Sequence, residues 1–136
     1  LKNIEEPTQL YLSLDAPTKE MYLKIDNPLF KDYWERFTKT IDLMSTLSSR
    51  KVVRLTLVKG LNMTGIKDYA KLIEKIDPQF IEVKAYMHVG FSKYRLPREA
   101  MPVHQEVKEF SQKLEKELSY KITDESKASR VVLLKK

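Results

Sequence analysis

The sequence predicts an α/β fold, a partial (β/α) barrel in which helices cover only one face of a mainly parallel sheet. Residues 9–15, 52–59 and 81–86 alternate between apolar and polar side chains, as half-buried strands do. Helical patterns lie between these runs, which favours parallel strands joined by right-handed crossovers. A sheet with helices on both faces has strands that are apolar on both faces. One polar face therefore indicates a piece of a barrel, because three βα units are too few to close one.

The first half of the chain is expected to contain a strand, two helices and a second strand. After the strand over residues 9–15, a short helix starts at Pro17, whose fixed φ suits the first helical position. Asn27 and Pro28 separate this helix from the next one. The spacing of its apolar residues predicts an amphipathic helix over 30–47, formed around Phe30, Trp34, Phe37, Ile41 and Met44.

The second half is expected to continue with a helix, a strand, a loop, a helix and two short strands. Apolar residues recur at helical spacing over 66–76, and Asp77 and Pro78 end that helix. A further helix, rich in Lys and Glu on its outer face, is expected over 103–118. Short strands are expected over 120–123 and 130–134.

Length and composition indicate one domain without a membrane segment or a thiolate metal site. The chain has 136 residues, of which 42% are hydrophobic and 32% charged, as in ordinary globular proteins. No apolar run approaches the roughly 20 residues of a membrane span, and no signal peptide is visible, so we expect a cytoplasmic protein and no membrane partner. There is no Cys and there are only two His, so no metal ligands are expected. The first residue is Leu, which suggests a piece of a longer protein.

The positive charge is concentrated in two stretches of the chain. The net charge is +6, yet residues 43–67 and 83–98 contain nine Lys and Arg and no acid, so the remaining residues carry −3. Positive charge gathered near one rim of the sheet is what a polyanion such as nucleic acid requires. The alternative is a set of scattered, solvated lysines.

Polar residues at the ends of the first two strands are candidates for ligand contacts, because ligands bind at the carboxyl ends of strands in βα folds. Ser13 and Asp15 end the first strand, and Asp15 could equally cap the following helix. Arg54 and Thr56 face the same side of the second strand. Lys59, a permissive glycine and Asn62 follow at the rim, where a plain glycine turn is the alternative.

The third strand carries Glu82, Lys84 and Tyr86 on one face. A desolvated lysine is paired or has a lowered pKa, and a neutral amine can form a Schiff base with a keto acid. We therefore expect Lys84, Glu82 and Asp15 to be candidates for the chemical step. A structural ion pair between Glu82 and Lys84 is the alternative.

The loop over residues 88–98 interleaves cations with aromatic rings, which is typical of RNA contacts because cations bind phosphate and rings stack on unpaired bases. The residues of this loop expected to contact RNA are Lys93, Tyr94, Arg95 and Arg98. Lys59 is expected to join them.

Six segments resemble, in order along nearly the whole chain, the archaeal-type tRNA 4-demethylwyosine synthases, the radical SAM enzymes of wyosine biosynthesis. They are YLSLDAPTKE (11–20), RLTLVKGLNM (54–63), FIEVKAYM (80–87), VGFS (89–92), MPVH (101–104) and SRVVLL (129–134). The resemblance is to the C-terminal part of the family. It implies that residues 1–100 are βα units of a radical SAM barrel and that residues 101–136 are a family-specific extension of helix and strands.

The resemblance also implies an activity, in which N1-methylguanosine at position 37 of tRNA-Phe is joined to carbons from pyruvate. The family's [4Fe-4S] cluster, held by CxxxCxxC, cleaves S-adenosyl-L-methionine, and further cysteines hold a second cluster. This chain has no such ligands, so it is expected to be inactive without the missing N-terminal, cluster-bearing region. Residues expected to hold S-adenosylmethionine are Ser13, Arg54, Thr56, Asn62 and Tyr86.

Two other functions remain open from the residues themselves. One is a Schiff-base lyase or aldolase that uses Lys84, for which borohydride trapping of pyruvate without any cluster is the test. The other is a non-catalytic RNA-binding module that uses the basic loops. Replacement of Lys93 and Arg98 by alanine tests that function through the salt dependence of tRNA binding.

Overall fold

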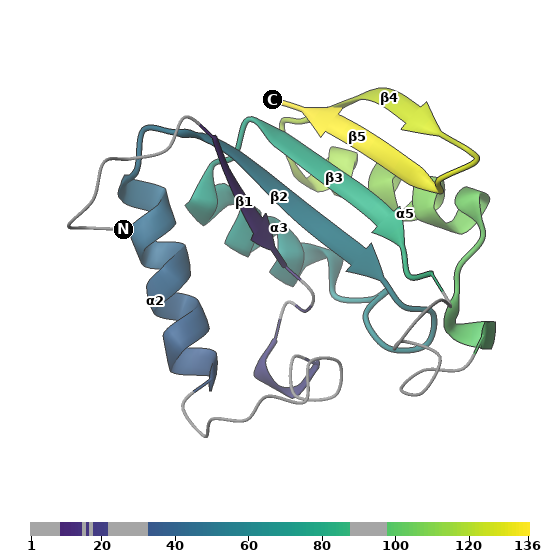
Figure 1. The fold of residues 1–136 in the computed structure, drawn as a ribbon, viewed down its shortest axis with the longest axis horizontal. Helices are drawn as coiled ribbons and strands as arrows, with labels where there is room; N and C mark the ends of the chain where they lie inside the picture. The colour runs from purple at the N-terminus through teal and green to yellow at the C-terminus, as the bar shows by residue number, and fades with distance from the viewer. Residues whose placement is uncertain (1–8, 15, 17, 22–32, 88–97) are drawn as a thin grey trace.

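The computed structural model describes residues 9–14, 16, 18–21, 33–87 and 98–136 (Figure 1). Its elements are, in chain order, β1 (Gln9–Ser13), α2 (Tyr33–Thr46), β2 (Arg50–Leu57), α3 (Ile66–Ile76), β3 (Phe80–Ala85), the 3₁₀ helix η1 (Arg98–Ala100), α5 (His104–Glu117), β4 (Lys121–Ser126) and β5 (Val131–Lys135). Residues 19–21 are also helical. In the described part of the chain, no helix is long and apolar enough to cross a membrane.

The strands form one five-stranded sheet in the order β1-β2-β3-β5-β4. β1, β2 and β3 are parallel neighbours, as the alternation of strands and helices predicted. β5 pairs antiparallel with β3, and β4 pairs antiparallel with β5, so the last two strands form a hairpin that adds to the parallel sheet. The prediction of a mixed α/β fold is confirmed, and residues 101–136 extend the same sheet that residues 9–85 build.

Helices α2, α3 and α5 pack on one face of the sheet. α2 packs against α3 and α3 against α5, and in Figure 1 these helices lie behind the sheet or beside β1. Burial alternates accordingly along β2, where Val53, Leu55 and Leu57 are at most 1% exposed while Arg54 and Thr56 are half-buried. A period of two is what a strand with one buried face requires. The opposite side, which we name the open face, carries the polar residues of β1, β2 and β3.

The predicted elements agree with the structure except at their ends. The helices expected over 66–76 and 103–118 are α3 and α5. The helix expected over 30–47 is α2, whose described part begins at Tyr33, and Pro17 at the expected start of the short helix lies outside the described residues. The strand expected over 120–123 continues to Ser126 because its backbone pairs with β5 along that length.

Two of the cations counted toward the rim lie at the opposite edge of the sheet. β2 begins with Arg50 and Lys51, so both sit at the amino-terminal end of the strand. Lys51 is 5% exposed, and its Nζ donates to the carbonyl oxygen of Ile76, in the last turn of α3, at 3.1 Å. A cation at a helix C-terminus is favourable. The expected concentration of positive charge at the rim is therefore smaller than the sequence indicated.

Tyr120 anchors the hairpin to this amino-terminal edge. It is 3% exposed, and its hydroxyl donates to the carbonyl oxygen of Pro78. Burial raises the pKa of Tyr120, so the hydroxyl remains a donor.

Replacement of Tyr120 by phenylalanine should destabilise the protein by about 1–3 kcal/mol, because it leaves the buried Pro78 carbonyl without its donor. Urea unfolding of the full-length protein measures this loss. The matched control is Tyr11→Phe, since Tyr11 is 55% exposed and its hydroxyl bond is at the surface. Equal destabilisation of both variants would contradict the anchoring role of Tyr120.

Candidate functional site

The open face brings polar groups of the three parallel strands into adjacent positions. The register places Ser13 beside Arg54, and Arg54 beside Glu82. One step nearer the carboxyl ends, Thr56 lies beside Lys84. The face therefore presents hydroxyl, guanidinium, carboxylate and amine groups together, in the arrangement that the alternation predicted.

Arg54 is held between two neighbours on the open face. Its guanidinium carbon lies 5.0 Å from the centre of the Tyr11 ring, and its Nε lies 3.4 Å from Glu82 Oε1 without hydrogen-bond geometry. Gln9 Nε2 donates to the Tyr11 hydroxyl at 2.7 Å, which steadies the ring. A cation over a tyrosine ring and beside a carboxylate is fixed in plane and direction. No site role was expected of Tyr11, although the alternation puts it on the same face as Ser13.

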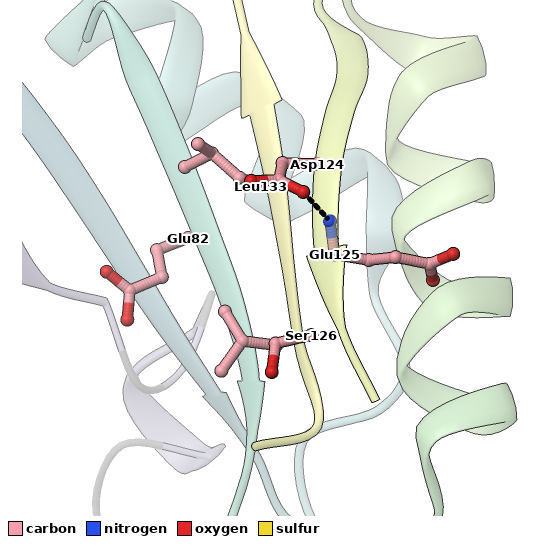
Figure 2. Close-up of a pocket in the computed structure, with 6 residues that line it drawn as sticks. Glu82, Asp124, Glu125, Ser126 and Leu133 are labelled. Carbon is pink, nitrogen blue, oxygen red and sulfur yellow. Dashed lines mark hydrogen bonds between the residues drawn. The ribbon is translucent and has the colours of Figure 1, made fainter. Parts of the chain in front are cut away.

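A cavity of about 250 Å³ opens beside Glu82, where β5 and β4 continue the sheet. Figure 2 shows Glu82, Asp124 and Ser126 around it, together with Leu133. Val131 and Glu125 complete the lining. Of the three carboxylates, that of Glu125 binds His104 and Lys108, so those of Glu82 and Asp124 are left beside the apolar floor. This lining suits a ligand that carries both a positive charge and an apolar part.

Thr56 and Lys84 lie nearer to the carboxyl ends of their strands, and both are half-buried. The antiparallel neighbour of Lys84 is Val131 in β5, so one side of the lysine is apolar. The amine therefore projects from the centre of the open face, with Thr56 on one side and the hairpin on the other. The ion pair between Glu82 and Lys84 that was the structural alternative is not among those the described residues form, since Glu82 pairs with Arg54.

Asn62, expected at the rim, and Tyr86, expected on the polar face of the third strand, are both buried. Asn62 is 1% exposed, its Oδ1 accepts from the Val58 backbone N–H at 2.6 Å, and its Nδ2 donates to the Thr56 carbonyl at 2.7 Å. Tyr86 is 5% exposed and packs in a small cluster with Val58 and Ala100. Asn62 shapes the loop after β2, and Tyr86 follows the end of β3, where the period of two no longer applies.

Lys59 forms an ion pair at the rim of the sheet. Its Nζ lies 3.2 Å from Glu106 Oε2, and Glu106 Oε1 accepts from the backbone N–H of Val103 at 3.0 Å, just before α5. The Val103 hydrogen bond, and after it Lys59, holds the pKa of Glu106 below its ordinary value of 4.5. The charge of Lys59 is therefore partly offset.

This pair predicts a pH dependence of stability. The pKa of Glu106 is lower in the folded than in the unfolded protein, so its contribution is present above about pH 4.5 and is lost as pH falls through the folded value. The variant Glu106→Gln should be less stable than the parent at neutral pH, and the difference should shrink on acidification. Urea unfolding at neutral pH and about pH 3.5 tests this. Glu74→Gln, at an exposed position of α3, is the control, and an equal pH effect in that variant would refute the assignment.

Several predicted site residues lie outside the described part of the chain. Asp15, Lys93, Tyr94 and Arg95 are in this group. Arg98 begins η1, and the backbone of η1 lies next to the rim because Ala100 accepts from the Lys59 N–H at 2.7 Å. Their expected roles in the chemical step and in RNA binding stay predictions.

The described residues contain no cluster of three His, Asp or Glu that could hold a metal ion. The sequence has no cysteine either, so the chain offers no thiolate to an iron–sulfur cluster. The groups on the open face differ from these sets of metal ligands. A guanidinium, hydroxyls and carboxylates bind organic ligands through hydrogen bonds and charge.

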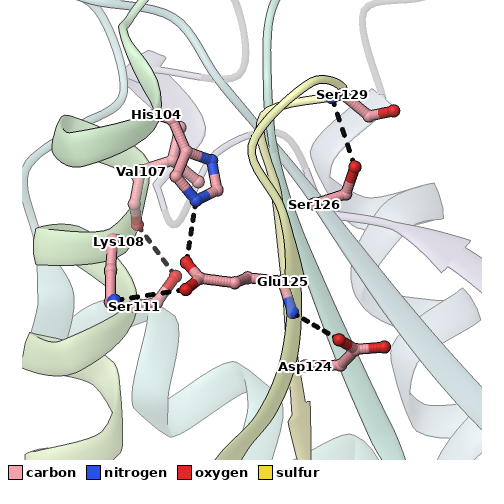
Figure 3. A network of polar contacts seen from close by, with 8 residues as sticks. All are labelled: His104, Val107, Lys108, Ser111, Asp124, Glu125, Ser126 and Ser129. Atoms are coloured by element: carbon pink, nitrogen blue, oxygen red, sulfur yellow. Dashed lines mark hydrogen bonds and ion pairs between the residues drawn. The ribbon is translucent and has the colours of Figure 1, made fainter.

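A polar network joins α5 to the hairpin behind the cavity. Glu125 accepts from Lys108 Nζ at 3.3 Å and lies 2.8 Å from His104 Nε2, while Asp124 lies on the other side of the strand (Figure 3). The hydrogen bond with His104 and then the one with Lys108 lower the pKa of Glu125. The network holds β4 against α5 and so fixes the wall of the cavity that Asp124 and Ser126 form.

Comparison with known families gives a match over residues 75–136 to the family described as wyosine base formation. That range contains β3, α5 and the β4–β5 hairpin, which include Glu82, Lys84 and the wall of the cavity.

Relatives match over almost the whole chain. The S-adenosyl-L-methionine-dependent tRNA 4-demethylwyosine synthase of Pyrococcus horikoshii is 50% identical over 98% of this chain and 40% of its own length. The human enzyme of that description, TYW1, is 43% identical over 84% of this chain and 16% of its own length. The chain thus spans well under half of the proteins it resembles.

Solved structures agree with the fold. A structure of TYW1 with a lysine-pyruvate adduct bound matches 96% of this chain and 41% of its own chain, with a TM-score of 0.83 and 41% identity. A crystal structure of archaeal TYW1 matches 96% of this chain and 40% of its own, with a TM-score of 0.75 and 36% identity. Agreement in sequence along 98% of the chain, and in fold along 96%, shows that nearly the whole chain is similar to one part of the tRNA 4-demethylwyosine synthases.

Proposed function

We propose that this chain forms the C-terminal part of a tRNA 4-demethylwyosine synthase and lines the cavity where S-adenosylmethionine and the substrates meet. The observation that carries the proposal is the open face, a polar surface shared by three parallel strands whose other side is packed with helices. In a soluble sheet, such a one-sided polar face is typical of a lumen that holds a ligand. The reaction builds 4-demethylwyosine from N1-methylguanosine-37 of tRNA-Phe and pyruvate.

The remaining strands of the barrel are proposed to add to β1. Among the described strands, β1 pairs only with β2, and it is parallel to it, so its free edge suits another parallel strand. The N-terminal, cluster-bearing region supplies those strands in this proposal, and it brings the cysteines that the chain lacks. The completed protein is a cytoplasmic enzyme.

The proposed contacts of S-adenosylmethionine are Arg54, Ser13 and Thr56. The guanidinium of Arg54 suits a carboxylate, with which it forms parallel hydrogen bonds, and the two hydroxyls suit the ribose and the amino group. The cavity beside Glu82 and Asp124 suits a positively charged sulfonium. When bound, S-adenosylmethionine supplies the 5′-deoxyadenosyl radical.

Glu82 and Tyr11 are proposed as positioning residues. Both contact Arg54, one through an ion pair at 3.4 Å and the other through its ring at 5.0 Å. Because the guanidinium donates in a rigid fork, its plane decides whether two hydrogen bonds reach a carboxylate. This role differs from the part in the chemical step that was expected of Glu82.

The remaining candidate residues are proposed to contact the substrate, to support the loops at the rim or to bind tRNA. Asp15 is proposed to contact the substrate, since it follows Ser13 and Leu14 at the end of β1. Asn62 and Tyr86 are proposed to support the loops at the rim rather than to touch the cofactor. The proposed contacts with tRNA phosphate and bases are Lys59, Lys93, Tyr94, Arg95 and Arg98.

Lys84 is proposed to form a Schiff base with pyruvate. Its amine would attack the keto carbon and release water, and reduction with borohydride would convert the imine to a stable secondary amine. Incubation of the full-length protein with pyruvate and borohydride should add the mass of the reduced pyruvoyl group to the peptide that contains Lys84. Lys84→Arg should abolish this adduct while Lys75→Arg, at the surface of α3, leaves it intact. An adduct that maps to another lysine and persists in Lys84→Arg would refute the role of Lys84.

Reconstitution tests the proposed function as a whole. The full-length protein, loaded with its clusters and reduced, should convert tRNA-Phe bearing N1-methylguanosine-37 to 4-demethylwyosine when S-adenosylmethionine and pyruvate are supplied. Mass spectrometry of the digested tRNA detects the product, and tRNA without the methyl group is the control. Pyruvate trapping and turnover without any cluster would instead indicate a Schiff-base lyase. Failure to form the nucleoside from a loaded and reduced protein would contradict the proposal.

A further inference from the structure

A groove on the helix side of the molecule is lined by lysines that the site on the open face does not use. It has a volume of about 400 Å³ and lies between the start of α3 and the last turns of α5. Gly65, Ile66 and Lys67 line one wall, and Lys113, Lys116 and Glu117 line the other. We name it the lysine groove. Since the helices lie behind the sheet, the groove is separate from the cavity beside Glu82 (Figure 1).

The three lysines of the groove line one cavity and have no acidic partner among the described residues. Lys67, Lys113 and Lys116 are exposed, and none of them forms an ion pair with another residue that the structure describes. By contrast, some lysines elsewhere lie against a carboxylate: Lys59 against Glu106, Lys75 against Asp42, Lys108 against Glu125 and Lys136 against Asp77. Other exposed lysines, such as Lys39, Lys127 and Lys135, form no ion pair among the described residues, but they do not share a cavity. Three cations and one acid, Glu117, among the described residues that line this cavity create a positive potential there.

The electrostatics of the helices do not account for all three lysines. Lys113 and Lys116 lie in the last part of α5, where the helix dipole favours cations. Lys67 lies in the first turn of α3, where the dipole opposes a cation. Its charge adds to that of the two α5 lysines across the groove, so the arrangement favours an anion that neutralises all three.

We propose that the lysine groove binds the phosphate backbone of the tRNA substrate, away from the nucleotide that is modified. Lysine binds phosphate as a point charge, and a chain with one charge per nucleotide can satisfy several lysines at once. One wall of the groove, at the start of α3, follows the loop that leaves the carboxyl end of β2, and the other wall, at the end of α5, precedes Tyr120 at the amino-terminal edge of the sheet. A tRNA is long compared with this chain, and a base at the open face leaves other nucleotides free to reach the helix layer. The proposal rests on tRNA being the substrate, as proposed above.

The test measures tRNA binding against salt concentration with the full-length, cluster-loaded protein. The variant Lys67→Gln/Lys113→Gln/Lys116→Gln removes the three cations. The control Lys39→Gln/Lys127→Gln/Lys135→Gln removes three exposed lysines of α2, the β4–β5 turn and β5, which gives the same change in net charge. A plot of the logarithm of the tRNA association constant against the logarithm of salt concentration has a negative slope. In the groove variant, the magnitude of this slope should decrease by about two units, since each lost phosphate contact contributes roughly 0.7 to 0.9. In the control variant the slope should fall by much less.

Enzyme kinetics separates this proposal from the proposed function. The groove variant should raise KM for tRNA about tenfold or more and leave kcat at saturating tRNA unchanged. Cleavage of S-adenosylmethionine without tRNA should also be unchanged. If the parent forms no 4-demethylwyosine but the salt slope still falls in the groove variant, the proposed function fails and the groove proposal stands. Equal salt slopes in the groove and control variants would overturn the groove proposal, and retained tRNA binding with lost binding to anionic vesicles would assign the groove to a membrane surface instead.

Discussion

Replacement of Arg54 by lysine should weaken the affinity of the full-length protein for S-adenosylmethionine by about 10- to 150-fold. Lysine keeps the positive charge but loses the planar fork that gives two parallel hydrogen bonds to a carboxylate. A hydrogen bond to a charged group contributes about 1.5–3 kcal/mol, which corresponds to this range of affinities. Isothermal titration with the cluster-loaded protein measures the affinity.

The neighbours of Arg54 provide graded controls for this result. Tyr11→Phe keeps the ring under the guanidinium and should leave the affinity nearly unchanged, while Tyr11→Leu removes the ring and should weaken it by a smaller factor than Arg54→Lys. Glu82→Gln removes the charge that faces Arg54 Nε and should also weaken binding. Unchanged affinity in Arg54→Lys, with unchanged circular dichroism, would show that S-adenosylmethionine does not use this guanidinium.

Replacement of Leu55 by alanine should destabilise the protein by about 2–5 kcal/mol. Leu55 is 1% exposed in the second strand of the sheet and belongs to the main core together with residues of all three long helices. Loss of its side chain removes apolar burial and leaves a cavity that the surrounding helices fill only in part. Urea unfolding of the full-length protein gives the change in the free energy of unfolding.

The next residue along the strand gives a matched control. Thr56 is half-buried and points to the open face, so Thr56→Ala should cost less than about 1 kcal/mol in stability. The same substitution should lower affinity for S-adenosylmethionine if the hydroxyl binds it. Comparable destabilisation by Leu55→Ala and Thr56→Ala would contradict a sheet whose core lies on one side only.

Short-range patterns in the sequence were sufficient to locate most of the helices and strands. Alternation with a period of two located β1, β2 and β3, and helical spacing located α2, α3 and α5, because each pattern reflects the direction of successive side chains. The pairing of the last two strands could not be read in this way. β5 lies between β3 and β4, and this order depends on contacts between residues far apart in sequence.

The positions of the candidate site residues were predicted well within the strands and less well beyond the strand ends. Arg54, Glu82 and Lys84 lie within strands, so their shared face followed from the alternation. Tyr86 lies just past the end of β3 and Asn62 lies in a loop, and both turn into buried contacts. The contact of Tyr11 with Arg54 depends on the register between β1 and β2, which the sequence does not specify by itself.

The sequence by itself determined the class of fold, the polar face and the resemblance to the synthase family, because these depend on residue types at regular spacing. Tertiary structure decided which charges are available. It buried Lys51 against the end of α3, paired Lys59 with Glu106, and brought Lys67 into one groove with the lysines of α5. The physical reason is that a charge acts over a few ångströms of space, and positions far apart in sequence become neighbours only when the chain folds.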